Sequence, residues 1–207
     1  MSTLRMTSDL RRQLILSAAK RCFARNGFAG TTTKSVAAAA AISEALLFKH
    51  FPNKRALYRA ILQYKIDDAE RAFPLEDSLL SLGDEAFFLR IATHLMRRVD
   101  ADDTFCRLML RSAMDGHDLA RRFRKARSGK LLGLMEKKIR LRGGRRGAPP
   151  PVDPRLAARI FSGMIFSAML NRRIFREEIV SRTSLDDLAR AMVRVFLEGI
   201  GGVEEGS

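Results

Sequence analysis

The most constraining feature of the sequence is residues 31–57, which read TTTKSVAAAAAISEALLFKHFPNKRAL. Small apolar residues at 36, 37 and 40 predict a short helix over residues 33–40. A second helix of about two turns is predicted over residues 44–50. Pro52 ends it, because a residue that precedes proline is pushed out of the helical region. The stretch therefore predicts two short helices joined by a tight turn at Ala41-Ile42.

Capping residues mark the N-termini of these helices. Thr31 or Thr32 can cap the first helix, Ser43 the second, and Asn53 a third helix that starts at Lys54. Leu47 and Phe51 lie four residues apart, so they share one face, which we expect to be buried. The residues then left on or near the outer face are Glu44, Ala45, Leu46, Phe48 and Lys49.

Two short helices with a small-residue turn fit the helix-turn-helix, whose second helix enters the DNA major groove. Across residues 12–58 the sequence also resembles the TetR-type (tetracycline-repressor-like) bacterial transcriptional regulators. The matching residues are Ile15, Leu16, Ala18, Ala19, Phe23, Gly27, Phe28, Thr31, Thr32, Val36, Ala37, Ala40, Ile42, Ser43, Leu47, Phe48, His50, Phe51, Pro52, Lys54, Ala56 and Leu57. Two positions depart from that family: Ala41 stands where glycine is usual, and Glu44-Ala45-Leu46 where Lys-Gly-Thr is frequent.

The resemblance implies a DNA-binding surface on the two short helices. The residues assigned to it are Thr32, Thr33, Lys34, Ser43, Glu44, Ala45, Leu46, Phe48, Lys49, His50 and Lys54. Lys54, His50 and Ser43 are expected to meet phosphates, and Ala45, Leu46 and Lys49 to approach base edges. Glu44 either accepts a hydrogen bond from cytosine N4 or serves only as a first-turn carboxylate, and we favour the second role.

The rest of the chain predicts an all-α fold, because strand signals and hairpin turns are scarce. Further helices are expected over residues 8–26, 54–73, 83–99, 103–115, 119–140, 154–176 and 185–199, with residues 143–151 as a loop. We predict a three-helix DNA-binding domain over residues 1–53. Residues 54–207 are then a helical domain for effector binding and dimerisation.

Charge is distributed unevenly. The net charge is +15 for the chain, +9 for residues 1–60, −3 for residues 61–100, +9 for residues 101–147 and zero for residues 148–207. A basic N-terminal segment suits a phosphate backbone. The second basic stretch, residues 121–146, has three interpretations: an anionic effector site, extra DNA contact, or a solvated helix face, which we favour.

A small-molecule effector is implied by the family resemblance. The residues that could line its site are Phe87, Phe88, Ile91, His94, Leu95, Met109, Met114 and His117. Their character predicts an apolar or amphipathic ligand, although each residue singly fits a plain core position equally well.

The last two predicted helices carry the clearest apolar stripes. The resembled family dimerises through such helices as a four-helix bundle, and we therefore predict a homodimer. The predicted interface residues are Ile160, Met164, Ser167, Ala168, Leu188, Met192 and Phe196.

Several classes of function lack support in the sequence. The three histidines show no metal-ligand spacing with Cys22 or Cys106, and no polar cluster suggests catalysis. No metal, cofactor or disulfide is expected. The sequence lacks a signal peptide or an apolar run of about 20 residues, which predicts a cytoplasmic protein without a membrane partner.

The sequence thus predicts a dimeric repressor that binds a palindromic operator on double-stranded DNA and is released by an effector. One alternative is a non-specific architectural DNA-binding protein that uses its basic surface alone. A weaker one is an enzyme with the helix-turn-helix as an appendage.

Overall fold

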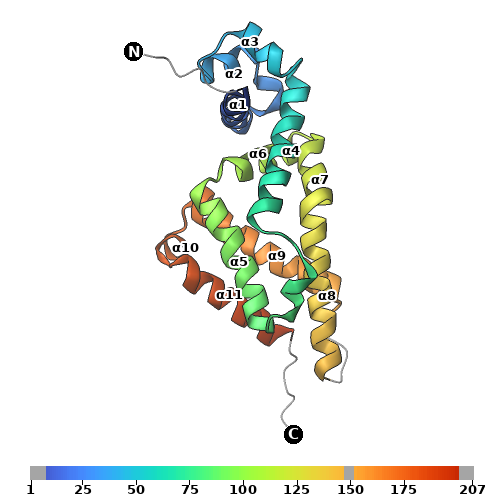
Figure 1. Ribbon diagram of the computed structural model, residues 1–207. Helices are drawn as coiled ribbons and strands as arrows, with labels where there is room; N and C mark the ends of the chain where they lie inside the picture. Colours follow the sequence, from blue (N-terminus) through green and yellow to red (C-terminus); the bar gives the residue numbers. More distant parts are fainter. Residues whose placement is uncertain (1–7, 147–151, 201–207) are drawn as a thin grey trace, which may run out of the picture. The chain divides into compact units, whose positions relative to one another are not determined.

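The computed structural model describes residues 8–146 and 152–200, and every regular element in these ranges is helical (Figure 1). The predicted all-α fold is confirmed. The chain divides into two compact units. The first comprises Met1–Ala72 with Thr104–Ala126, and the second Phe73–Asp103 with Arg127–Ser207. Residues 1–7 lie outside the described residues.

Four helices open the first unit: α1 (Ser8–Gly30), α2 (Thr33–Ala39), α3 (Glu44–His50) and α4 (Lys54–Ala72). Figure 1 shows α1, α2 and α3 gathered at one end of α4. Their shared core contains Ile15, Phe23, Val36, Leu47 and Leu57, each no more than 1% exposed. Within α1 the buried residues Ile15, Ala18, Ala19 and Phe23 recur at helical spacing, which is why this helix was predictable.

Two later helices, α6 (Thr104–Met114) and α7 (Asp118–Phe123), belong to the same unit, and α6 packs along α1. Gly27, at the kink of α1, has φ of +69°. A Cβ at this position would lie 2.6 Å from Asp115 Oδ2 and 3.1 Å from Arg111 Nε, so a side chain there would force these two side chains to shift. The compact unit therefore extends beyond the expected residues 1–53, and the functional boundary at residue 54 stays a prediction.

The second unit contains a 3-10 helix, η1 (Asp77–Ser81), and the helices α5 (Asp84–Ala101), α8 (Gly129–Arg146), α9 (Pro154–Leu170), α10 (Glu178–Arg182) and α11 (Leu185–Gly199). Phe88, Phe161 and Phe196 meet in its core with ring centroids 4.7–5.0 Å apart. Offset and edge-to-face aromatic contacts of this kind add to simple burial of apolar area.

Helix ends in this unit differ from expectation in three places. The predicted helix over residues 119–140 is divided, since the π-helical segment η2 (Arg124–Ser128) joins α7 to α8. The predicted helix over 154–176 ends in another π-helical segment, η3 (Asn171–Phe175), and α10 was not predicted. Residues 143–146 continue α8 rather than forming a loop, and residues 147–151 lie outside the described residues.

Part of the basic stretch over residues 121–146 faces inward. Lys138 is fully buried, and its ammonium donates to the carbonyls of Leu80, at 3.0 Å, and Leu82, with Asp84 Oδ1 at 3.4 Å. The buried Arg127 donates to the Phe73 carbonyl. These cations hold the segment between α4 and α5 against η2 and α8. None of the three interpretations of residues 121–146 included this structural role.

Arg172 makes a similar tie around α10. Its guanidinium donates to the carbonyls of Val180, Ser181 and Thr183 at 2.8–3.0 Å, and to Asp100 Oδ1 at 2.9 Å.

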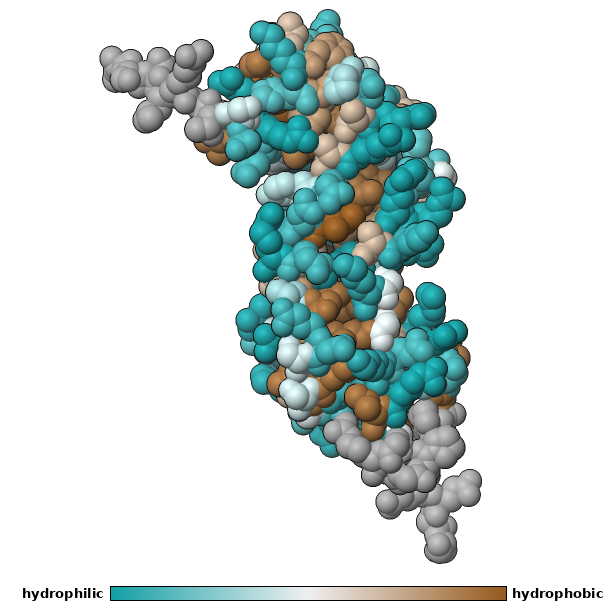
Figure 2. Space-filling view, turned by 45° about the vertical axis from the view of Figure 1, so that its right-hand side comes forward, coloured by the Kyte–Doolittle hydropathy of each residue, from teal (hydrophilic) through white to brown (hydrophobic). Residues whose placement is uncertain are grey.

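Hydrophilic side chains cover most of the face shown in Figure 2, as expected for a chain with 29% charged residues.

The turn between α2 and α3 has a left-handed residue. Ala41 has φ of +53°, and Ile42 N–H donates to the Ala37 carbonyl at 3.0 Å to close the turn. The predicted turn at Ala41-Ile42 is confirmed. Because an L-residue is strained in this region while glycine is not, Ala41 holds the conformation that the family's usual glycine takes freely.

Replacing Ala41 with glycine is expected to raise the free energy of unfolding by up to about 1 kcal/mol, because the left-handed strain is relieved. Ala39→Gly is the matched control: Ala39 is exposed in α2, so glycine there should lower stability by about 0.5–1 kcal/mol. Urea denaturation measures both. Equal losses in the two variants would contradict the strained turn.

Lys138→Ala should cost about 3–5 kcal/mol of unfolding free energy, because it leaves two carbonyls and Asp84 without their buried cation. The neighbouring Lys137 makes an exposed ion pair with Asp77 at 2.7 Å, so Lys137→Ala should cost less than about 1 kcal/mol. Thermal unfolding of both variants measures the difference, and similar melting temperatures would refute the proposed buried tie.

Candidate nucleic-acid interface

Helix α3 is held on the first unit by its buried face. Ser43 caps it, with Oγ accepting from the Leu46 N–H at 3.2 Å. Leu47 is fully buried and Phe51 is 3% exposed, as the four-residue spacing predicted. Asn53 Oδ1 accepts from the Ala56 N–H at 2.8 Å, which fixes the start of α4. Only seven residues long, α3 depends on these contacts because a helix of this length is unstable alone in water.

The opposite face of α3 is open to solvent. Ala45 and Lys49 are exposed, Phe48 is 45% exposed, and Leu46 and His50 are half-buried. These residues lie where the sequence placed them. On α2, the predicted contacts Thr32 and Lys34 are exposed as well, and Thr32 caps the helix by accepting from the Ser35 N–H at 3.0 Å. Their contacts with DNA stay predictions.

Glu44 and Thr33 are joined directly. The Thr33 hydroxyl donates to Glu44 Oε1 at 2.5 Å, linking the first turn of α2 to the first turn of α3. Sequence reasoning considered the two residues separately. No periodic pattern signals this contact, because it crosses the turn between two helices.

Lys54 has a structural role that the sequence did not reveal. Its ammonium donates to the carbonyls of Phe28, at 2.8 Å, and Thr31, at 2.9 Å, and lies 4.5 Å from the centroid of the Phe28 ring. A cation at these carbonyls is favourable because the C-terminal end of α1 carries partial negative charge. Its expected phosphate contact therefore competes with an internal one and stays a prediction.

Arg12 is a further cation near α3. Its guanidinium carbon lies 4.5 Å from the centroid of the Phe51 ring, a cation–π contact, and the residue is exposed. Phe51 is the C-cap of α3. No carboxylate among the described residues pairs with Arg12, so its N–H groups remain available for an anion. Its position on α1 gave no sign of this contact in the sequence.

The predicted effector residues are divided between the two units. Phe87, Phe88 and Ile91 are no more than 1% exposed and belong to the core of the second unit, with Leu95 half-buried at its edge. Met109, Met114 and His117 belong to the first unit, where Met114 is 76% exposed and the His117 ring packs on Phe28. The contributions of these residues to a ligand site stay predictions.

Of the predicted effector residues that lie in the second unit, His94 is the polar one. It is half-buried and stacks on Phe73 with ring centroids 4.5 Å apart. Burial lowers the pKa of His94 below its usual value, and the neighbouring Arg98, Arg127 and Arg90 lower it further. The imidazole is therefore kept neutral within a cationic surrounding.

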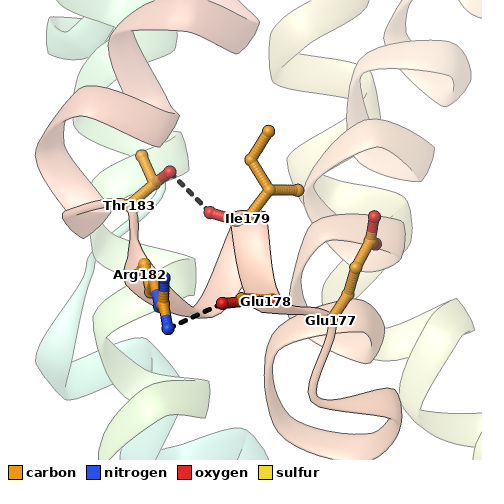
Figure 3. Close-up of a pocket in the computed structure, with 5 residues that line it drawn as sticks. All are labelled: Glu177, Glu178, Ile179, Arg182 and Thr183. Carbon is orange, nitrogen blue, oxygen red and sulfur yellow. Dashed lines mark hydrogen bonds and ion pairs between the residues drawn. The ribbon is translucent and has the colours of Figure 1, made fainter.

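A surface hollow lies along α10, lined by Glu177, Glu178, Ile179, Arg182 and Thr183 (Figure 3). Its polar groups are mostly paired with one another, since Arg182 contacts Glu178 at 2.6 Å and Thr183 Oγ1 donates to the Ile179 carbonyl at 2.7 Å. It contains none of the predicted effector residues. The hollow is open to solvent.

The predicted dimer residues divide between the chain's own core and its surface. Ala168, Met192 and Phe196 are at most 9% exposed and pack in the second unit, so they cannot form the exposed part of an interface. Met164 and Leu188 are half-buried, whereas Ile160 and Ser167 are exposed. The large apolar residues exposed on α9 and α11 are Leu156, Ile160, Phe166 and Val195.

Within residues 8–146 and 152–200, no group of three or more histidine, cysteine, aspartate or glutamate side chains lies close enough to hold a metal ion. Within the same ranges, every helix is too short or too polar to cross a bilayer.

Comparison with solved structures gives the same fold. AibR, solved in complex with isovaleryl coenzyme A and operator DNA, superposes with a TM-score of 0.68, covering 89% of this chain and 97% of AibR at 24% sequence identity.

Two curated relatives are transcriptional regulators of the helix-turn-helix type from Escherichia coli K12. UidR is 37% identical over 90 residues, a match that spans only 44% of UidR and 37% of this chain. RutR is 31% identical over 150 residues, covering 70% of this chain and 66% of RutR. Residues 15–61, which contain α2, α3 and most of the α1 core positions, match the family described as bacterial regulatory proteins, tetR family. The N-terminal match, the longer likeness to RutR and the shared fold together establish that this chain belongs to the TetR family.

Proposed function

We propose that the protein is a sequence-specific DNA-binding transcriptional regulator, acting as a repressor that a small molecule releases from its operator. One observation carries the proposal. Helix α3 has Leu47 fully buried while Ala45, Phe48 and Lys49 on its other side are exposed. A short helix fixed by one face, with the other free to enter a groove, is the arrangement by which a helix-turn-helix reads DNA. The relatives UidR and RutR, regulators of this type, support it.

Charge supports the same function. Residues 1–60 carry a net charge of +9, and Lys34, Lys49 and Arg12 are exposed near or on the two short helices. Cations placed in this way position a protein on the phosphate backbone, whereas base-edge contacts supply the sequence preference. The architectural alternative would use the charge without the groove contacts, so it predicts binding without sequence preference.

Two copies of α3 are needed to read a palindromic operator. The exposed face of α9, with Leu156, Ile160, Gly163 and Ser167 at alternating spacings of four and three residues, is suited to another helix, and a Cβ at Gly163 would meet no atom within 4 Å. Val195 of α11 is 63% exposed. The proposed contact between protomers therefore lies on these outward faces rather than at Met192 and Phe196.

Release from DNA requires a ligand that binds the DNA-incompetent form more tightly than the DNA-bound form. We retain the apolar or amphipathic effector as part of the proposal. Isovaleryl coenzyme A in the AibR structure is an amphipathic ligand of a protein with this fold. The effector's binding would be measured as a fall in operator affinity on its addition.

Binding-site selection from random duplex DNA tests the proposed function, and two substitutions separate reading from positioning. Lys49→Ala should change the preferred bases, by roughly 1–3 kcal/mol for a lost guanine contact. Arg12→Ala should weaken binding to all DNA sequences alike. It should also reduce the slope of log affinity against log salt concentration by about one, because one phosphate contact is lost. Arg182→Ala, whose side chain is 80% exposed on α10, is the charge-matched control and should leave the slope unchanged. A changed sequence preference in Arg12→Ala with none in Lys49→Ala would contradict this assignment.

The homodimer has its own test. Ile160→Arg places a charge on the proposed interface, and sedimentation at micromolar concentration should show a shift from dimer to monomer because an unpaired charge would be buried on association. Arg159→Ala, a change at the exposed residue that precedes Ile160 in α9, should leave the dimer intact. A wild-type chain that sediments as a monomer would refute the dimer.

A further inference from the structure

The link between Thr33 and Glu44 defines the chemistry of the first turn of α3. Ser43 already accepts from the Leu46 N–H, so a serine hydroxyl caps the helix and the Glu44 carboxylate does not. Glu44 Oε1 instead accepts the Thr33 hydroxyl proton at 2.5 Å. The carboxylate is therefore held by a residue of α2 in a defined position at the start of α3.

Once this hydrogen bond has formed, the Thr33–Glu44 pair can still accept hydrogen bonds but has no proton left to donate. The Thr33 proton is used, so its hydroxyl cannot donate that proton to a phosphate. Each carboxylate oxygen accepts more than one hydrogen bond. Among the described residues Glu44 makes no second hydrogen bond and no ion pair, so Oε2 remains an acceptor. Glu44 is half-buried, and the exposed Ala45 beside it offers no donor or bulk.

The major groove offers few partners for a fixed acceptor. Guanine presents the acceptors N7 and O6, and thymine presents O4, so both repel a carboxylate. Adenine presents a donor at N6 beside an acceptor at N7, whereas cytosine presents only its N4 donor. A carboxylate that enters the groove on the first turn of α3 is therefore satisfied best by cytosine.

We propose that Glu44 is a specificity-determining residue that selects a cytosine in each half-site, and that Thr33 is the positioning residue that orients its carboxylate. The proposal rests on the proposed DNA-binding function and reverses our expectation from the sequence, in which Glu44 served only the helix dipole. Fixing a flexible side chain before binding reduces the entropy lost on binding, which sharpens discrimination between bases.

The test uses the whole 207-residue chain. Binding-site selection from random duplex DNA first identifies the preferred half-site, and dissociation constants are then measured with each base pair substituted in turn. The wild type should prefer cytosine at one position by roughly 5- to 150-fold, the range for a specific base contact. Glu44→Ala should lose that preference and keep the preferences at other positions.

Glu44→Gln gives a readout that a purely structural role would not move. Glutamine pairs with adenine through N6 and N7, so the preferred base at that one position should change from cytosine to adenine. Thr33→Val removes the hydroxyl at nearly constant volume and should reduce the cytosine preference several-fold. Thr33→Ser retains a hydroxyl and should keep the wild-type preference for cytosine. Thermal unfolding confirms that each variant is folded. If Glu44→Ala does not fold, Glu44→Gln and Thr33→Val decide the question.

The outcomes separate this proposal from the proposed function. If the wild type selects no sequence from the random library, DNA reading itself is wrong and this proposal fails with it. If the wild type selects a site but Glu44→Ala and Glu44→Gln weaken all sequences equally, Glu44 is only a tie between α2 and α3. The same conclusion follows if the wild-type site holds no cytosine whose preference depends on Glu44.

Discussion

The structure of the first unit depends on holding a seven-residue helix in place. An isolated helix of two turns does not form in water, because the few hydrogen bonds it gains do not offset the entropy lost in nucleation. Burial of Leu47 and Phe51, the Ser43 cap and the Thr33–Glu44 hydrogen bond supply the missing stabilisation from outside the helix. The same contacts fix which side chains of α3 face solvent. Folding of the unit and presentation of its candidate reading surface are therefore one event.

Cations inside both units perform a second structural task. Lys54 binds two carbonyls at the end of α1, Lys138 binds two carbonyls ahead of α5, and Arg172 binds three around α10. Burying a cation is costly unless oxygen atoms replace its hydration. Lys138 is fully buried, Lys54 and Arg172 are half-buried, and each has such oxygen partners. Consequently, the net charge of +15 overstates the charge available to DNA. Among the exposed cations of the first unit, Arg12, Lys34 and Lys49 are the ones that we propose for contact with DNA.

Some features were predictable because they depend on neighbours in sequence. The caps at Ser43 and Asn53 are realised, since each side chain accepts from a backbone N–H three residues ahead. The bounds of α3 and α11 match the predicted ranges. The residues available for a dimer interface were harder to predict from the sequence. Helical periodicity identified an apolar stripe on α11, but it could not show that Met192 and Phe196 pack on the chain's own core.

The sequence by itself determined the helical class, the short helix pair and its turn, and the family to which the N-terminal residues belong. These follow from local backbone preferences and from spacings within a few residues. The tertiary structure decided which cations are internal, how Ala41 adopts a left-handed conformation, and that Thr33 holds Glu44. Such contacts join residues on different helices, and their partners are set by how those helices pack. Periodicity along one helix carries no information about them.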